Sequence, residues 1–388
     1  MDEFYECGIK TDSTALENSE LNLPEGIPAL KSFYLYLSDS CNLRCRHCWI
    51  TPTFVDGKAT PGNVIDVDHL KKAVYEGKSI GLSSAKLTGG EPLLHPEIRQ
   101  IMKMLTEENL NLDMETNGTL IDREIADFMK NETNLSFISI SLDSPTEKYH
   151  DAFRGSKGAY RAALNGLTNL VAAGYNNVQI IMSPHRKNVG EVQELVALAE
   201  AKGAGSVKLN PVSNNGRGIK MHENDEALSI TEILALADKV RGDLGQSSKI
   251  PVILNVPPSV RPLSELTRTE RFCGDCGVDH ILGILGNGDI ALCGIGQNLP
   301  EFIYGNISTD SIRNIWLNHP LVKELRHELR DFNNYPELCR NCIYMRKCRT
   351  GCVVQNYTNF EKLIWPQSIC LYAEENGLFK DSRKRVRL

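Results

Sequence analysis

The run Ser-Cys-Asn-Leu-Arg-Cys-Arg-His-Cys-Trp at residues 40–49 decides how the rest of the chain is interpreted. Its cysteines, Cys41, Cys45 and Cys48, follow directly on the apolar, strand-like segment 33–37. Thiolate is a soft ligand that favours iron-sulfur clusters, and a four-iron cubane normally takes four such ligands. Three protein ligands leave one iron open to an exogenous molecule. The run therefore predicts an iron-sulfur site with one open coordination position.

Outward from this loop, short apolar segments alternate with segments of helical periodicity. Strands are expected near residues 33–37, 85–88, 110–116, 137–142, 177–182 and 206–210, and helices near residues 67–80, 97–108, 122–130, 160–173 and 189–202. Such alternation requires a parallel sheet with right-handed crossovers, and about six units predict an incomplete barrel that is open on one side. The predicted fold class is α/β, with a partial (β/α)6 barrel.

Three further motifs come where predicted strands end, as the cysteine loop does. They are Gly89-Gly90-Glu91, Thr116-Asn117-Gly118 and Asp143. Because the chemistry of parallel barrels collects at the carboxyl ends of the strands, we expect all four groups on one rim. Glycines permit close approach of backbone to a ligand, and Glu91 offers an acceptor for an ammonium group. A lone Gly-Gly-Glu is typical of an ordinary turn, but its place one strand after the cysteines favours ligand binding.

The CxxxCxxC spacing followed by Gly-Gly-Glu-Pro at residues 89–92 resembles the radical S-adenosylmethionine (SAM) superfamily. The resemblance implies that the cysteine triplet holds a 4Fe-4S cluster whose open iron chelates the amino and carboxylate groups of SAM. It also implies that Glu91 receives the ammonium group of the cofactor. The residues expected at the cofactor are Gly89, Gly90, Glu91, Asn117, Ser141, Arg154 and Trp49.

Simpler interpretations compete with some of these roles. Asp143 is also typical of a helix cap or turn residue, and Arg154 is also typical of a surface ion pair. His47 is expected to be a loop residue rather than a ligand, since the cysteine triplet is complete without it. Trp49 stands where the family commonly has an aromatic residue that shields the cluster or the adenine.

Eight more cysteines form a second system in the C-terminal third of the chain. CxxC pairs are usual in structural zinc sites, so one or two zinc ions are one interpretation. The cysteine order, with Gly305-Asn306-Ile307 and Ile315-Trp316 between its halves, resembles the SPASM extension of radical SAM enzymes, which carries two auxiliary 4Fe-4S clusters. By that resemblance, Cys273, Cys276, Cys293 and Cys352 hold the nearer cluster, and Cys339, Cys342, Cys348 and Cys370 hold the farther one. The chain is then expected to bind three 4Fe-4S clusters and SAM.

A proton must leave the substrate if the substrate radical is oxidised. Asp275, Asp279 and His280 lie among the ligands of the nearer auxiliary cluster, and this position alone makes them candidates for the base. A surface or structural role is the competing interpretation for each.

Four segments describe the expected domain organisation. Residues 1–30 are polar, with Pro24, Gly26 and Pro28 near their end, and predict an irregular lead-in. Residues 31–230 form the partial barrel, residues 231–270 a bridging helix and strand, and residues 271–388 the cysteine-rich SPASM domain.

Composition excludes several classes of protein. The net charge is -6 and no domain-sized stretch is strongly basic, which argues against nucleic acid as a partner. No run of about 18 apolar residues and no apolar signal core occurs, so a cytoplasmic protein without a membrane partner is expected. Twelve cysteines in such a chain indicate metal ligation rather than disulfides, because the cytosol keeps thiols reduced.

The leading function hypothesis is a peptide maturase that installs an oxidative cross-link in a ribosomally made precursor peptide, because known SPASM members chiefly modify peptides or protein side chains. A flavodoxin- or ferredoxin-type protein is the expected electron donor. The 32 residues before the first strand are too few for a winged-helix leader-binding module, so a separate leader-binding protein is a further expected partner.

Three alternatives stay open. A formylglycine-generating, sulfatase-maturing enzyme typically has an aspartate directly after the cysteine where this chain has Gly294, which lowers that interpretation. A radical enzyme that oxidises a small molecule or tetrapyrrole side chain is the second, and a non-catalytic iron-sulfur or zinc scaffold is the third.

Overall fold

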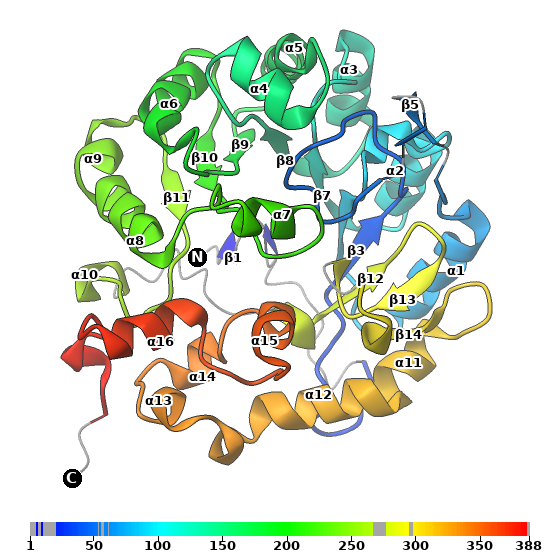
Figure 1. Cartoon of the computed structure of the whole chain (residues 1–388). Coiled ribbons are helices and arrows are strands. Elements are labelled where there is room, and N and C mark those ends of the chain that lie inside the picture. Colours follow the sequence, from blue (N-terminus) through cyan, green and yellow to red (C-terminus); the bar gives the residue numbers. More distant parts are fainter. Residues whose placement is uncertain are drawn as a thin grey trace.

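One ten-stranded sheet organises the computed structural model, which describes residues 5–6, 9–10, 21–52, 54–55, 58–60, 62–266, 277–294 and 298–385 (Figure 1). Its strand order is β11-β10-β9-β8-β7-β6-β3-β12-β13-β14, and the strands from β11 to β12 are all parallel. The strands are β3 (Ser32–Tyr36), β6 (Ser84–Thr88), β7 (Asn111–Thr116), β8 (Leu135–Ser141), β9 (Gln179–Met182), β10 (Ser206–Leu209), β11 (Val252–Leu254), β12 (Ile281–Ile284), β13 (Asp289–Ala291) and β14 (Ile303–Asn306). Two small hairpins, β1 (Tyr5–Glu6) with β2 (Ile9–Lys10) and β4 (Phe54–Val55) with β5 (Lys58–Ala59), lie apart from it.

Helices cover the outer face of the parallel strands (Figure 1). The crossover helices are α1 (Val67–Lys78), α2 (Ile98–Glu107), α3 (Arg123–Glu132), α4 (Glu147–Arg154), α5 (Ala159–Ala172) and α6 (Val192–Ala201). Aspartates define where two of them begin, since Asp66 and Asp122 accept backbone N–H groups of the first turns of α1 and α3. None of the helices among the described residues is both long and apolar enough to cross a membrane.

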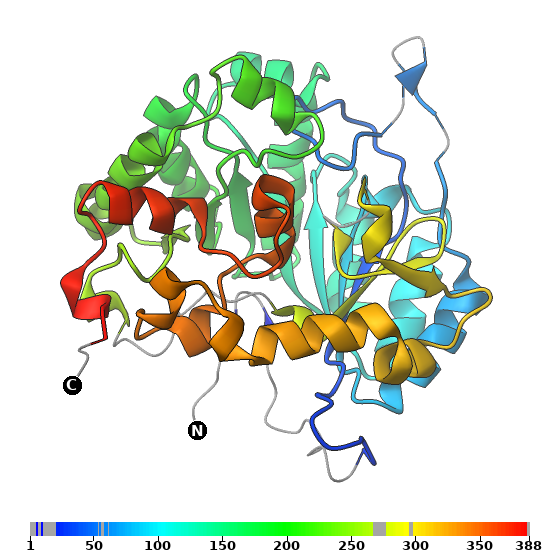
Figure 2. The ribbon, with the colours of Figure 1, turned by 60° about the horizontal axis from the view of Figure 1, so that its bottom comes forward.

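The remaining helices belong to the second half of the chain. They are α7 (Gly218–Glu223), α8 (Ile230–Lys239), α9 (Gly245–Ser247), α10 (Leu263–Leu266), α11 (Ile312–Asn318), α12 (Pro320–Arg330), α13 (Glu337–Arg340), α14 (Met345–Cys348), α15 (Val353–Phe360) and α16 (Ser368–Glu375). Helices α13–α16 lie across the side where the ring of strands stays open, and α16 contacts α8 (Figure 1). Figure 2 shows α12 along the lower side of the molecule.

The two faces of the sheet differ in polarity because side chains alternate along each strand. Phe33 and Leu35 of β3, and Leu112 and Met114 of β7, are buried in the main core with residues of the outer helices. The alternate positions on the inner face carry polar side chains, among them Tyr34, Lys86, Asp113, Glu115, Ser139, Gln179 and Lys208.

The structure confirms the predicted α/β class, and the six predicted strands occur in the predicted order. The count of parallel strands was too low, because β11 and β12 add one strand at each edge of the six. Strand β12 comes from the segment expected to form the C-terminal domain, yet it pairs with β3 in the register Ile281↔Ser32. The C-terminal segment is thus built onto the barrel sheet.

Candidate active site at the carboxyl ends of the strands

The cysteine loop after β3 is fixed by the end of α4. The backbone N–H of Arg44 donates to the carbonyl oxygen of Arg154 at 3.0 Å. Helix α4 ends at Gly155, whose φ is 69°, and a Cβ there would lie 2.5 Å from the Arg44 carbonyl oxygen. A left-handed residue this close to backbone favours glycine, so Gly155 lets the loop reach the helix end. Cys41 and Cys45 are buried in this arrangement.

The three thiols of the loop influence one another. Burial is the largest cause that raises the pKa of Cys41 to about 12, and the charges of Glu91, Cys45 and Cys48 contribute in the same direction. A bound metal has the opposite effect, since it holds its cysteine ligands as thiolates. Among the described residues, no three or more His, Cys, Asp or Glu side chains are placed to hold a single metal ion. A cluster that spreads its ligands over several irons stays the prediction for this triplet.

Gly89 and Gly90 let the end of β6 pack onto the cysteine loop. The N–H of Gly90 donates to the carbonyl oxygen of Ser38 at 2.7 Å, and a Cβ on Gly90 would lie 2.0 Å from the carbonyl oxygen of Ser40. A Cβ on Gly89 would lie 2.7 Å from the same oxygen of Ser38. The close approach that the sequence predicts is thus made to backbone, and contact with a cofactor stays a prediction.

Glu91 joins the ends of β6 and β7 from a fully buried position. Its carboxylate accepts hydrogen bonds from Thr116 Oγ1 at 2.7 Å, from the N–H of Asn117 at 2.8 Å and from the N–H of Leu93 at 3.2 Å. Burial raises the pKa of Glu91 to about 6, although these hydrogen bonds act in the opposite direction. The carboxylate is mostly ionised at neutral pH, as reception of an ammonium group requires.

Asn117 connects β7 to the cysteine loop. Its amide Nδ2 donates to Asn42 Oδ1 at 2.8 Å and lies 3.9 Å from Cys41 Sγ, and the N–H of Leu43 points at the same sulfur at 3.4 Å. Donors to sulfur favour the thiolate form that a metal needs. Asn117 is therefore placed beside the predicted cluster.

Asp143 and Arg154 form a buried ion pair, with side chains 1% and 7% exposed and 2.5 Å between Oδ2 and Nε. Arg154 Nη1 also lies 3.5 Å from Cys45 Sγ, and the N–H of Ser183 donates to Asp143 Oδ1 at 2.9 Å. Burial alone would raise the pKa of Asp143, but Arg154 holds it below the ordinary value. The alternative of a surface ion pair for Arg154 is wrong, because the pair supports the cysteine loop from within.

A stack of three rings that sequence reasoning missed covers one side of the loop. His47 is stacked on Phe153 at 4.6 Å between ring centroids, and Phe153 on His185 at 4.5 Å. Burial lowers the pKa of His47 to about 3, with Arg154 adding to the effect, so its ring is neutral. The stack joins segments far apart in the chain, and no local pattern signals it.

Trp49 and Ser141 are placed on different sides of the rim. Trp49 meets Tyr36 edge-on at 5.6 Å, and its carbonyl oxygen accepts from Asn298 Nδ2 at 3.0 Å, so it faces the C-terminal segment. Ser141 ends β8 and aligns with Ile181 of β9. Cofactor contacts of both stay predictions.

Asp279 and His280, two of the candidate bases, do not lie at this rim. Asp279 is buried in an ion pair with Arg349, and His280 Nδ1 lies 3.1 Å from the carbonyl oxygen of Ala29. Both precede β12, whose first residue aligns with the first residue of β3. They therefore lie at the amino ends of the strands, opposite the cysteine loop, and we do not retain them as bases. Asp275 lies outside the described residues.

The four thiols predicted to hold the farther cluster influence one another electrostatically. Burial raises the pKa of Cys339, and the charges of Cys370, Cys348 and Cys342 raise it further. The Sγ of Cys370 lies 3.2 Å from Ser259 Oγ. Of the nearer set, Cys293 follows β13 and Cys352 precedes α15, whereas Cys273 and Cys276 lie outside the described residues. Both ligand sets stay predictions.

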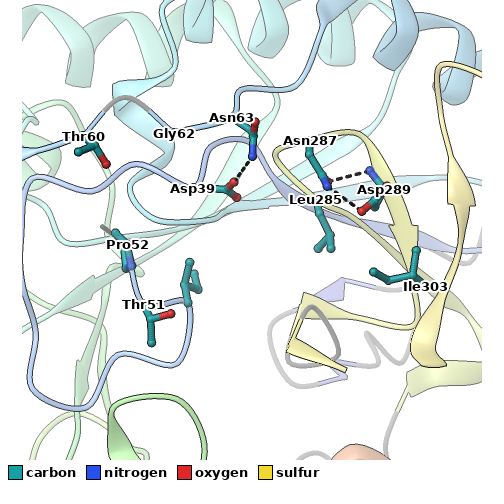
Figure 3. A pocket seen from close by; sticks show the side chains of 11 residues that line it. Asp39, Thr51, Pro52, Thr60, Gly62, Asn63, Leu285, Asn287, Asp289 and Ile303 are labelled. Atoms are coloured by element: carbon teal, nitrogen blue, oxygen red, sulfur yellow. Dashed lines mark hydrogen bonds between the residues drawn. The ribbon is translucent and has the colours of Figure 1, made fainter. Parts of the chain in front are cut away.

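A cavity of about 490 Å³ lies on the outer side of the cysteine loop (Figure 3). It separates Asp39 and Thr51 from the turn between β12 and β13. Asp39 Oδ2 accepts from Asn63 Nδ2 at 2.8 Å, and Asp289 Oδ2 accepts from Asn287 Nδ2 at 2.7 Å. The cavity gives polar space next to the rim.

Comparisons with known proteins find relatives over most of the chain. Mycofactocin maturase MftC of Mycobacterium ulcerans is 26% identical over 339 residues, covering 86% of this chain and 86% of that protein. The AdoMet-dependent heme synthase of Methanosarcina barkeri is 27% identical over 351 residues, covering 87% and 95%. The crystal structure of Streptococcus suis SuiB bound to precursor peptide SuiA superposes with a TM-score of 0.67 at 16% identity, covering 91% of this chain and 77% of that one.

Two family models match separate parts of the chain. Residues 35–199 match the radical SAM superfamily, and residues 273–343 match the SPASM iron-sulfur cluster-binding domain. The first match contains the cysteine triplet and Gly-Gly-Glu, and the second contains most of the C-terminal thiols. The chain therefore belongs to the radical SAM superfamily of enzymes and carries a SPASM domain.

Proposed function

We propose that this chain is a maturase that abstracts a hydrogen with a 5'-deoxyadenosyl radical and oxidatively cross-links residues of a ribosomally made precursor peptide. The observation that carries the proposal is the presence of two separate thiol groups in one fold. One is the triplet beside Cys41 at the rim, and the other is the group around Cys339 in the C-terminal segment. When bound, SAM and three 4Fe-4S clusters supply the radical and the acceptor for the substrate electron.

The residues of the chain position and shield that chemistry. Asn117 and Arg154 direct N–H groups at the sulfurs of Cys41 and Cys45, which favours the thiolate form. The stack that begins at His47 excludes water from one side of the loop. A flavodoxin- or ferredoxin-type protein delivers the electron from outside, and a separate protein binds the leader of the substrate.

Two relatives support a peptide substrate. MftC is a maturase that matches over most of both chains, and SuiB, which shares the fold, was crystallised with its precursor peptide. The heme synthase matches equally well, so oxidation of a tetrapyrrole side chain is the second candidate function. A formylglycine-generating activity is disfavoured, because Tyr36 fills the space where residue 294 would carry an aspartate side chain.

Anaerobic reconstitution of the full chain tests the proposal. We expect about twelve irons per chain, 5'-deoxyadenosine on reduction with dithionite, and loss of two hydrogens from any short peptide that proves to be encoded near the gene. Cys41→Ala is expected to abolish cofactor cleavage, whereas Cys7→Ala, outside every predicted ligand set, is expected to retain it. Full iron content without cofactor cleavage would refute catalysis, and cleavage with an unmodified peptide would refute the peptide substrate.

A further inference from the structure

The inner face of the barrel sheet carries a group of charged side chains for which the rim site has no use. Lys86 of β6, Asp113 and Glu115 of β7, and Lys208 of β10 all occupy inward positions. Lys86 is 22% exposed and Glu115 is 41% exposed, although both lie among the strands. The interior of the open ring is therefore accessible to solvent, and a ligand at the rim can reach these groups.

Most of the polar groups on this face already have partners. Lys86 Nζ pairs with Glu115 Oε1 at 2.8 Å and lies 4.9 Å from the ring centroid of Tyr34. Gln179 Nε2 donates to Ser206 Oγ at 3.1 Å. Lys86 and Glu115 therefore pair with each other.

Lys208 differs from these neighbours. Within the part of the chain that the structure describes, no hydrogen bond or ion pair involves its ammonium group. Burial lowers the pKa of Lys208, the nearby Lys86 lowers it further, and Glu115 acts in the opposite direction. Burial raises the pKa of Asp113 to about 7, so that carboxyl group carries only part of a charge at neutral pH. Of the two carboxyl groups near the two lysines, Asp113 is thus only partly ionised at neutral pH, and Glu115 is already paired with Lys86.

A partly desolvated cation without a partner is costly, and a bound anion offsets that cost. Lys208 aligns with Ile181, which aligns with Ser141, the last residue of β8, so Lys208 occupies an inward position near the rim end of the strands. A carboxylate suits this place better than a phosphate, because a dianion would be repelled by Glu115. On the basis of the proposed function, we propose that Lys208 binds a carboxylate of the substrate inside the barrel.

The carboxylate has two possible sources, an acidic side chain or C-terminus of a peptide and a propionate of a tetrapyrrole. The test uses the reconstituted full chain with SAM and two sets of probes. One set is a translated library of random peptides, in which the binding of peptides that contain Asp or Glu is compared with the binding of peptides that contain Asn or Gln. The other is iron coproporphyrin III compared with its tetramethyl ester.

We expect wild type to retain roughly ten- to hundredfold more of the acid than of its amide or ester in one of the two sets of probes. Lys208→Met is expected to lose this preference, whereas Lys208→Arg retains it. Lys202→Met, which changes an exposed lysine at the end of α6, is the matched control and is expected to leave the preference unchanged. SAM affinity, measured by equilibrium dialysis, is expected to stay within twofold in all variants.

Three results would overturn the assignment. If wild type retains acids and their neutral analogues equally, the protein does not recognise a carboxylate. If Lys208→Met still prefers acids, Lys208 is not the residue that binds the carboxylate. A loss of SAM affinity in Lys208→Met assigns the lysine to the cofactor instead. Acid preference confined to the porphyrin set would keep the role of Lys208 while refuting the peptide substrate. Absence of SAM cleavage would refute the proposed function without changing the binding result.

Discussion

Gly294 lies directly against the phenol ring of Tyr36, and a Cβ on Gly294 would fall 1.6 Å from Cζ of that ring. Tyr36 is 6% exposed at the end of β3, and its ring also meets Trp49. The segment after Cys293 therefore reaches the rim through a residue without a side chain. Any side chain at position 294 requires the ring of Tyr36 to leave its place.

This contact predicts that Gly294→Ala destabilises the protein. We expect a loss of about 1–3 kcal/mol in the free energy of unfolding, because the added methyl group overpacks a buried contact. The double variant Tyr36→Ala with Gly294→Ala is expected to show less than the sum of the two single losses, since the clash is gone. Gly190→Ala is the control, as nothing lies within 4 Å of a Cβ there. Urea denaturation provides the measurement, and additive losses in the double variant would contradict the contact.

The Asp143–Arg154 pair predicts a large effect of Asp143→Asn. The change leaves a buried guanidinium without its counter-ion, for which we expect a loss of about 3–5 kcal/mol in stability. Because Arg154 also reaches Cys45 Sγ, the iron content of the triplet is expected to fall in parallel. Glu124→Gln removes the partner of Arg99 in an exposed pair and is expected to cost at most about 1 kcal/mol. Similar losses in both variants would show that the buried pair does not support the loop.

The alternation of strands and helices could be predicted because each segment has its own spacing of apolar residues. The site at the rim could be predicted because its motifs follow directly on the predicted strands. The place of the edge strands in the sheet could not be predicted. A strand was expected within residues 231–270, but its pairing with β10 was not, and the pairing of β12 with β3 joins segments about 250 residues apart. The position of Asp279 and His280 could not be predicted either, because sequence proximity to cysteines does not tell which end of a strand a residue occupies.

The inner charges could have been found from the sequence. Ser-Ala-Lys-Leu-Thr at 84–88, Asn-Leu-Asp-Met-Glu-Thr at 111–116 and Ser-Val-Lys-Leu at 206–209 place polar or charged side chains at every second position of the strands. Parallel strands buried on both faces are normally apolar throughout, so this alternation indicates one solvated face. The partners of these charges, by contrast, depend on register across strands and required the structure.

Asp113 predicts a pH-dependent contribution to stability. Burial raises its pKa to about 7 in the fold, so the folded state binds more protons than the unfolded state between roughly pH 4 and pH 7. The free energy of unfolding therefore falls as pH rises through this window. Asp113→Asn removes the effect, and we expect this variant to gain stability over wild type at pH 8 but not at pH 4. Asp243→Asn, at an exposed position, is the control, and equal behaviour of the two variants would contradict the assignment.

Removal of iron is expected to loosen the C-terminal helices selectively. Helices α13 and α16 contribute to a small cluster of buried residues that includes Cys342, Ala373 and Phe379, whereas the parallel strands, α14 and α15 contribute to the large core. A metal that joins the surrounding thiols then supplies much of the local stability. Hydrogen exchange of the chelated protein should show at least tenfold faster exchange in α13 and α16 and unchanged protection in β6–β9. Unchanged exchange in α13 and α16 would show that packing alone holds these helices, and equal acceleration in β6–β9 would show that the metal sites stabilise the whole sheet.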